Sequence, residues 1–201
     1  MIMKVLQSCI EIKIAVIGDE SVGKTAITRR YLGEPFTDYK PTLAADLYLK
    51  RTSYNVEPFG RCDIMWIIVD MSGRQIFEFI RQQYYRGAKA AIVVFDVSQP
   101  ETFKSIPRWI KEFWKYSGGM NPFIIIGNKI DLRETTNCIP YEYGANYAKE
   151  LSRVAGMPIT YVETSARNGI NIEKAFELLA NTIITSLIMK QESREVGKLH
   201  E

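Results

Sequence analysis

The sequence predicts an α/β domain, with helices on both faces of a mostly parallel β-sheet. Apolar segments of strand length alternate along the chain with segments of helical periodicity. The strand segments are continuous apolar runs, which is typical of parallel strands that are buried on both faces. One pair of strand segments is separated only by a turn at residues 57–61, which predicts a hairpin and so one antiparallel strand at a sheet edge.

The elements follow one another in a regular order, and glycine or proline marks most of their boundaries. Strands are predicted at residues 12–17, 47–56, 64–69, 90–95, 123–126 and 159–162. Helices are predicted at residues 26–32, 76–85, 102–116, 141–151 and 172–189. We expect one domain at residues 1–189 and a short mobile tail at residues 190–201, which is of mixed charge.

The composition excludes several classes of protein. The 201 residues are 46% hydrophobic and 24% charged, as in an ordinary globular protein, and the net charge of +3 is too small to predict a nucleic-acid partner. Cys9, Cys62 and Cys138 lie far apart without a C-x-x-C pair, so we expect free thiols, with neither a disulfide framework nor a zinc site. The only histidine is His200, which argues against histidine-based catalysis.

Residues 18–25 read G-D-E-S-V-G-K-T and fit the phosphate-binding pattern G-x-x-x-x-G-K-[ST]. A buried strand precedes the loop and a helix follows it, which is the setting in which backbone N–H groups and a helix N-terminus can surround phosphates. We expect the ammonium of Lys24 to pair with the terminal phosphates and the hydroxyl of Thr25 to ligate Mg²⁺. The alternative is an ordinary strand-to-helix turn with a surface lysine. The predicted phosphate-loop residues are Glu20, Ser21, Val22, Gly23, Lys24, Thr25 and Ala26.

Because ligands bind beyond the carboxyl ends of strands in open α/β sheets, the residues just after each strand are candidates for the ligand site. Asp70 follows the strand at 64–69 and suits the role of a Mg²⁺ holder acting through water. Gly73, three residues later, allows the backbone to approach the last phosphate closely. Taken alone, D-x-x-G is an ordinary Asp–Gly turn, and its value comes from its position in the chain.

Residues 128–131 read N-K-I-D and follow the buried strand at 123–126. The carboxylate of Asp131 can accept two hydrogen bonds from the N1–H and amino group of guanine, which adenine lacks, and the stem of Lys129 can lie over the base. With Asn128 these residues predict guanine recognition, although N-K-x-D in isolation could be a polar turn. The loop after the strand at 159–162 would close over the base from the other side through Ser165, Ala166 and Arg167.

Two residues of the loop after the first helix complete the site. Phe36 is placed to stack on the guanine face, and its alternative role is to anchor the loop in the core. Thr42 is placed to offer its hydroxyl to Mg²⁺ when a γ-phosphate is present, and its alternative is an ordinary turn threonine after Pro41.

This set of motifs, in this order and spacing, resembles the Ras superfamily of small GTPases. The segments Y-Y-R-G-A at residues 84–88, I-V-V-F-D-V at 92–97 and Y-K-P-T at 39–42 are most similar to the Rab branch, and the resemblance covers about residues 11–188. It implies a P-loop NTPase fold (G domain) with a six-stranded sheet, which binds GTP or GDP with Mg²⁺ in a switch for signalling or vesicle trafficking. It also adds Tyr39 to the nucleotide site.

The resemblance further implies two switch regions, here residues 37–46 and 70–85, which bind an effector, an exchange factor and an activating protein. The γ-phosphate would hold Thr42 through Mg²⁺ and the N–H of Gly73 directly, and its loss would release both loops. Water attacks the γ-phosphorus in line, and positioning and charge neutralisation carry the catalysis. The residues implied in catalysis are Lys24, Thr42, Gly73, Arg74 and Gln75.

The largest departure from the family pattern is Arg74, which stands where the family has a glutamine that orients the attacking water. A guanidinium has only donors and cannot accept a hydrogen bond from that water, so we predict slow intrinsic hydrolysis. Two alternatives remain: Gln75 takes over that role, or Arg74 acts as a built-in arginine finger on the γ-phosphate.

Other departures affect the rims of the site. The carboxylate of Glu20 in the phosphate loop is unfavourable near a γ-phosphate unless it points to water, and it stands where an arginine from a partner would enter. The first switch loop is one residue shorter than is common. Leu47 and Val69 replace aromatic residues that usually contact Rab effectors, so the resemblance to Rab proteins predicts ancestry more than partners. Arg167 replaces a usual lysine, and we expect little effect on nucleotide binding because the backbone makes most of the contacts there.

The ends of the chain predict no membrane attachment. The last residues contain no cysteine for prenylation, Met1 is followed by Ile2, not glycine, and no apolar run approaches the ~20 residues of a membrane span. Residues 1–7 do not resemble a signal peptide. We therefore expect a cytoplasmic protein without a lipid anchor, and a monomer.

Three functions are compatible with the sequence. The leading one is a GTPase switch with slow turnover. The second is a GTP-binding interaction scaffold with negligible turnover, which Arg74 and Glu20 favour. The third is a P-loop ATPase or kinase, against which Asp131 argues.

Overall fold

The computed structural model describes residues 9–37, 39–56 and 60–198. Six strands form one sheet in the order β2-β3-β1-β4-β5-β6. The strands are β1 (Ile10–Ile17), β2 (Ala45–Val56), β3 (Gly60–Met71), β4 (Ala90–Asp96), β5 (Phe123–Asn128) and β6 (Thr160–Glu163). β2 pairs antiparallel with β3, and every other pairing is parallel. The predicted α/β class, the six strands and the single antiparallel edge strand are confirmed.

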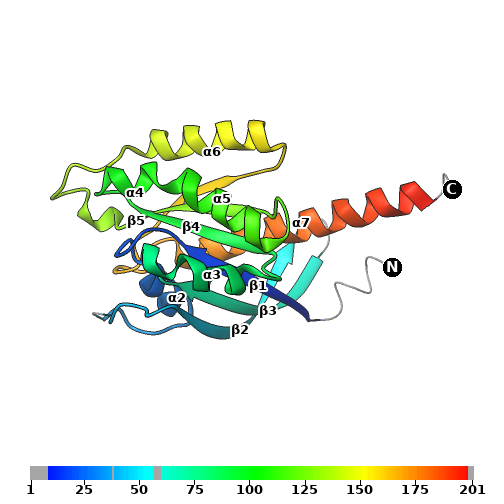
Figure 1. Cartoon of the computed structure of the whole chain (residues 1–201), viewed down its shortest axis with the longest axis horizontal. Helices are drawn as coiled ribbons and strands as arrows, with labels where there is room; N and C mark the ends of the chain where they lie inside the picture. Colours follow the sequence, from blue (N-terminus) through cyan, green and yellow to red (C-terminus); the bar gives the residue numbers. More distant parts are fainter. Residues whose placement is uncertain (1–8, 38, 57–59, 199–201) are drawn as a thin grey trace.

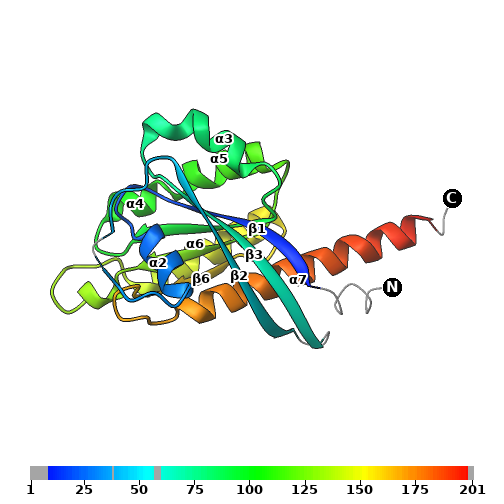
Figure 2. The same ribbon diagram turned by 90° about the horizontal axis from the view of Figure 1, so that it is seen from below.

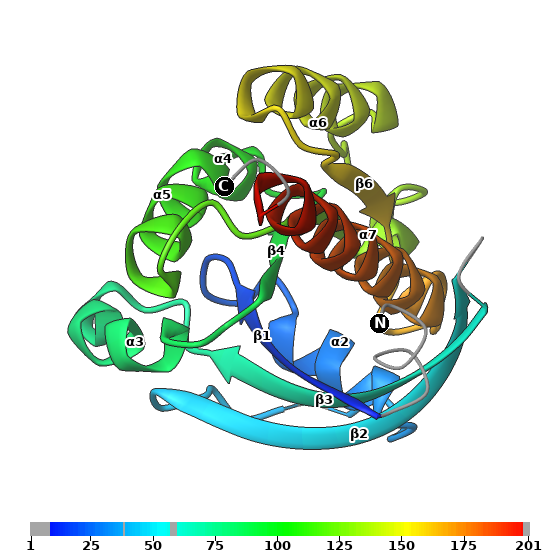
Figure 3. The same cartoon turned by 90° about the vertical axis from the view of Figure 1, so that its right-hand side faces the viewer.

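Helices cover both faces of the sheet (Figure 1). They are α2 (Lys24–Tyr31), α3 (Glu78–Tyr85), α4 (Pro100–Lys104), α5 (Ile106–Ser117), α6 (Tyr141–Ala155) and α7 (Ile172–Lys198). Figure 3 shows α7 on one side of the sheet and α3 and α5 on the other. The sheet thus has two separate apolar cores, one on each face.

The alternation of side chains along β1 explains the two cores. Ile14 and Val16 point to the core beneath α2 and α7, whereas Ala15 and Ile17 point to the core beneath α3, α5 and α6. Successive side chains of a strand face opposite sides of the sheet, so a strand covered on both faces is apolar at every position. All four residues are fully buried.

The edge hairpin is longer than its apolar runs suggested. β2 and β3 pair over Ala45↔Met71 to Val56↔Gly60 and form a long ribbon in Figure 2. Because one face of an antiparallel edge pair contacts water, polar residues such as Arg51 and Ser53 belong to the strand. Of the turn predicted at residues 57–61, Gly60 and Arg61 belong to β3, and residues 57–59 lie outside the described part of the chain.

Two helix predictions need correction. The helix expected at residues 102–116 is two helices, α4 and α5, which are joined at Ser105. Pro107 lies in the first turn of α5, where its missing N–H is not needed, whereas in one continuous helix it would remove a hydrogen bond. The segment expected as a helix at residues 76–85 begins with a 3₁₀ helix, η1 (Gln75–Phe77), before α3.

The C-terminal helix is also longer than predicted. α7 continues to Lys198, past the expected end at Met189 and into the segment expected as a tail. Its last turns project beyond the rest of the domain in Figure 1. The apolar periodicity in the sequence marks only the part of α7 that packs on the domain. A helix can continue beyond its packed part. Whether residues 190–198 move independently stays a prediction, and residues 199–201 lie outside the described part.

Candidate nucleotide-binding site

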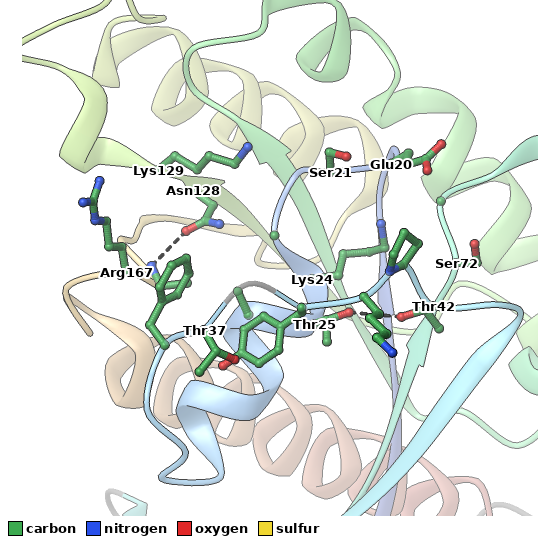
Figure 4. A pocket seen from close by; sticks show the side chains of 18 of the residues that line it. Glu20, Ser21, Lys24, Thr25, Thr37, Thr42, Ser72, Asn128, Lys129 and Arg167 are labelled. Carbon is green, nitrogen blue, oxygen red and sulfur yellow. Dashed lines mark hydrogen bonds between the residues drawn. The ribbon is translucent and has the colours of Figure 1, made fainter.

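One pocket of about 800 Å³ opens at the carboxyl ends of the strands, within the size range of small-ligand sites. The loops after β1, α2, β3, β5 and β6 line it. Figure 4 shows Asn128, Lys129 and Arg167 on one side and Lys24, Glu20 and Ser72 on the other. Most of the predicted site residues line this pocket: Glu20, Ser21, Gly23, Lys24, Thr25, Ala26, Phe36, Tyr39, Thr42, Gly73, Arg74, Asn128, Lys129, Asp131, Ala166 and Arg167.

Four predicted residues do not line the pocket. Val22 and Asp70 are fully buried, and Ser165 is buried next to Asp131. Gln75 is exposed at the start of η1 and outside the lining, so this arrangement does not favour Gln75 as a substitute for the missing glutamine. Sequence reasoning did not include several further lining residues, namely Thr37, Lys40, Pro41, Met71, Ser72 and Leu132.

The phosphate loop is held in a conformation that glycine makes possible. Gly23 has φ +99°, and a Cβ there would lie 2.2 Å from the side-chain nitrogen of Asn128. That nitrogen donates a hydrogen bond of 2.9 Å to the carbonyl of Val22. Asn128 therefore ties the loop after β5 to the phosphate loop, and only glycine fits between them.

Lys24 is a buried cation at the first turn of α2, with 7% of its surface exposed. Its Nζ donates a hydrogen bond of 2.6 Å to the backbone carbonyl of Asp19. Burial lowers the pKa of Lys24 to about 8, and the charges of Asp70 and Asp19 offset part of this effect. A buried ammonium is costly without an anion beside it, so a phosphate group in the pocket would stabilise the charged form.

Three oxygen-bearing side chains converge beside Lys24. The hydroxyl of Thr25 donates to Oδ2 of Asp70 at 2.5 Å and lies 3.1 Å from the hydroxyl of Thr42. The other carboxylate oxygen of Asp70, Oδ1, makes no hydrogen bond to the residues that the structure describes. Burial raises the pKa of the Asp70 carboxyl to about 6, and the hydrogen bond from Thr25 offsets part of that effect.

This donor set fits Mg²⁺. Magnesium prefers oxygen ligands and is commonly held by one or two protein carboxylates together with substrate phosphates. Two hydroxyls and one carboxylate with an unpaired buried oxygen match that chemistry, and a divalent cation would favour the ionised form of Asp70.

The opposite side of the pocket is built by the N-K-I-D segment. The side-chain oxygen of Asn128 accepts hydrogen bonds from the hydroxyl of Thr164 (3.0 Å) and the N–H of Ala166 (3.2 Å). Oδ1 of Asp131 accepts a hydrogen bond of 2.6 Å from Ser165. These contacts hold the loops after β5 and β6 together. Oδ2 of Asp131, in the lining of the pocket, makes no hydrogen bond to the described residues.

Lys129 has a fixed anchor that sequence reasoning missed. Its ammonium lies 2.6 Å from Oδ2 of Asp96, which is 4% exposed at the end of β4. The other oxygen of Asp96 accepts hydrogen bonds from the N–H and hydroxyl of Ser98. The position of Asp96 at a strand end next to β5 is the signal that could have identified it, since Asp96 pairs with Asn128 in register.

Phe36 and Tyr39 belong to the loop after α2. Their rings meet edge to face with centroids 6.0 Å apart, and the guanidinium of Arg29 lies 5.0 Å from the Tyr39 ring. Phe36 is 41% exposed, so it lines the pocket and is not a core anchor. Stacking on a base stays a prediction for this ring.

Large apolar side chains are exposed along and beside the expected switch regions at residues 37–46 and 70–85, of which Asp38 lies outside the described residues. They come from the segment just before β2, from the first half of β2, and from η1 and α3, which makes this surface a candidate for partner binding. The residues are Leu43, Leu47, Leu49, Ile76, Phe79 and Ile80.

The chain is similar to known proteins over most of its length. The family model described as "Ras family" matches residues 13–185. The Ypt/Rab-type GTPase avaA of Emericella nidulans is 30% identical over 191 residues, which cover 92% of this chain and 86% of the relative. The Ras-related protein Rab7 of Drosophila melanogaster is 31% identical (86% of this chain, 80% of the relative), and the Ras-related protein RABA5d of Arabidopsis thaliana is 33% identical (92% and 80%). Among the described residues, no helix is long and apolar enough to span a membrane.

Proposed function

The chain belongs to the Ras family, and from this premise we propose that it is a Rab-like guanine-nucleotide switch that hydrolyses GTP slowly. The observation that carries the proposal is that the phosphate loop, the D-x-x-G loop and the N-K-I-D segment line one pocket. Lys24 supplies a buried positive charge to this pocket, and Asp131, which follows Asn128 and Lys129 in the chain and accepts a hydrogen bond from Ser165, supplies a carboxylate to its lining.

The chain's own residues suggest how the nucleotide is held. Backbone N–H groups of the phosphate loop and the ammonium of Lys24 bind the phosphates. Thr25, Thr42 and Asp70 would hold Mg²⁺, which neutralises charge on the phosphates when bound. Asp131 recognises the guanine edge. The anchored Lys129 is suited to pack its stem along the base.

Hydrolysis requires a water positioned in line with the γ-phosphorus. The water attacks that phosphorus, the bond to the bridging oxygen of GDP breaks, and inorganic phosphate and GDP are the products. Arg74 lines this side of the pocket in place of an acceptor, and Gln75 lies outside the lining. With no side chain at residue 74 that accepts a hydrogen bond from the water, we expect a low intrinsic rate.

The switch role involves protein partners. We propose that residues 37–46 and 70–85, with the exposed apolar side chains beside them, bind an effector, an exchange factor and an activating protein. The likeness to Rab-type GTPases suggests a part in vesicle trafficking, carried out from the cytoplasm by a monomer.

Competition between nucleotides tests the proposed base specificity. We expect GTP and GDP to displace a fluorescent GDP analogue from the protein in the presence of Mg²⁺, with ATP at least ~10³-fold weaker, since adenine lacks the two donors that guanine would offer to the carboxylate of Asp131. ATP that competes as well as GTP would contradict guanine recognition. Binding without any turnover, with or without cell extract as a source of activators, would favour the scaffold function.

A further inference from the structure

The two residues that depart most from the family pattern form an ion pair with each other. Nε of Arg74, on the loop after β3, lies 2.8 Å from Oε1 of Glu20, on the phosphate loop. Both residues line the pocket, and their side chains are 43% and 50% exposed. Exposed ion pairs add little to stability, so a pair at this place is more relevant to the bound nucleotide than to folding.

The backbones that carry the two side chains are held together closely. A Cβ on Gly73 would lie 2.4 Å from the backbone nitrogen of Glu20 and from the carbonyl carbon of Asp19. Gly73 therefore packs directly on the phosphate loop, and the next residue, Arg74, begins beside Glu20. The two side chains therefore start from neighbouring backbone positions and can pair directly.

Helix α5 supports both ends of the pair. The carboxylate of Asp19 accepts hydrogen bonds from Arg108 (2.7 Å) and Trp109 (2.8 Å) of α5, which fixes the phosphate loop beside Glu20. The carbonyl of Arg74 accepts a hydrogen bond of 2.7 Å from Arg81, and Arg81 forms a buried ion pair with Glu112 of α5. One rigid element thus sets the distance between the two loops.

We propose that Glu20 is a positioning residue that holds the guanidinium of Arg74 on the phosphate loop and keeps it from acting on the γ-phosphate. The inference rests on the proposed GTPase function. Among the described residues, the hydrogen bond to Glu20 is the only one that the Arg74 side chain makes. Without this carboxylate, the strongest anion near the guanidinium is the γ-phosphate of bound GTP. A guanidinium that contacts the transferring phosphoryl group accelerates hydrolysis.

A double-mutant cycle on single-turnover hydrolysis of Mg²⁺·GTP tests this role, with wild type, Glu20→Gln, Arg74→Gln and the double variant. We expect Glu20→Gln to raise the rate about tenfold or more, because it frees Arg74 while keeping the size of the side chain. In the Arg74→Gln background the same change should alter the rate less than about twofold, since there is no guanidinium to release. A wild-type-like or lower rate in Glu20→Gln, or an equal acceleration in both backgrounds, would overturn the proposal.

The salt dependence of the hydrolysis rate distinguishes this role from a purely structural one. An exposed ion pair weakens as ionic strength rises. We therefore expect the hydrolysis rate of the wild type to increase from about 0.05 to about 0.5 M KCl, and we expect no increase for Glu20→Gln or Arg74→Gln. Glu150→Gln, which removes an exposed ion pair with Arg153 on α6, is the matched control and should keep the salt response of the wild type. Binding of a fluorescent GDP analogue is measured in parallel. If neither the wild type nor any variant binds the GDP analogue, the proposed function is refuted. If they bind it but the effects of Glu20→Gln and Arg74→Gln on the rate are not coupled, only the role of Glu20 is refuted.

Discussion

Replacement of Asp131 by asparagine is expected to weaken GDP binding by about 10²–10⁴-fold. The carboxylate is proposed to accept two charge-assisted hydrogen bonds from guanine, each contributing about 1.5–3 kcal/mol. Asparagine keeps one acceptor oxygen but turns an amino group toward a donor of the base. It retains an oxygen that can accept the hydrogen bond from Ser165, so the loop itself should hold.

The measurement is equilibrium competition against a fluorescent nucleotide at fixed Mg²⁺. Xanthosine diphosphate is the internal control, because its base carries a carbonyl where guanine carries the amino group and can accept a hydrogen bond from asparagine. We expect its affinity to rise in the variant as that of GDP falls, which shows that the fold is intact. A loss of GDP affinity below about threefold would mean that Asp131 does not read the base.

Replacement of Glu112 by glutamine is expected to lower the free energy of unfolding by about 3–5 kcal/mol, because it leaves the buried charge of Arg81 without its partner. Arg81 and Glu112 are 1% and 8% exposed and meet at 2.7 and 3.1 Å. Tyr85 also donates a hydrogen bond of 3.0 Å to Glu112. Burial, together with the charge of Glu112, raises the pKa of Tyr85 well above its ordinary value, so this phenol stays a donor.

Urea unfolding monitored by tryptophan fluorescence, with the same excess of Mg²⁺·GDP for every protein, measures this effect. Glu101→Gln is the matched control, because it removes an exposed pair with Lys104 and should leave the unfolding midpoint within experimental error. Joint replacement by Arg81→Met and Glu112→Leu should cost less than Glu112→Gln, since no unpaired charge remains. Equal stability of Glu112→Gln and wild type would contradict the importance of this buried pair.

The fold and the two sides of the pocket were predictable because they depend on local patterns. Apolar runs identified every strand, and the rule that ligands bind at strand ends brought residues as distant as Lys24 and Asp131 to one site. The length of the hairpin and the end of α7 were less predictable, because polar residues can extend a strand or a helix without leaving an apolar pattern.

The side-chain pairs could not be predicted from the sequence. Glu20 and Arg74 are 54 positions apart, and Arg81 and Glu112 are 31 apart. A charged residue on an amphipathic helix is usually solvated, so nothing in the sequence marked Arg81 as buried. The first pair arises from the close approach of the loop after β3 to the phosphate loop, and the second arises from the packing of α3 against α5. Only the tertiary structure defines either contact.

Single-turnover hydrolysis of Mg²⁺·GTP by the wild type and by Arg74→Gln tests the proposed slow switch most directly. Glutamine both accepts and donates hydrogen bonds and can orient the attacking water, whereas a guanidinium paired with Glu20 cannot. We expect slow hydrolysis by the wild type and an increase of about tenfold or more in the variant. Fast hydrolysis by the wild type that falls on replacement of Arg74 would contradict this mechanism and identify Arg74 as a catalytic residue.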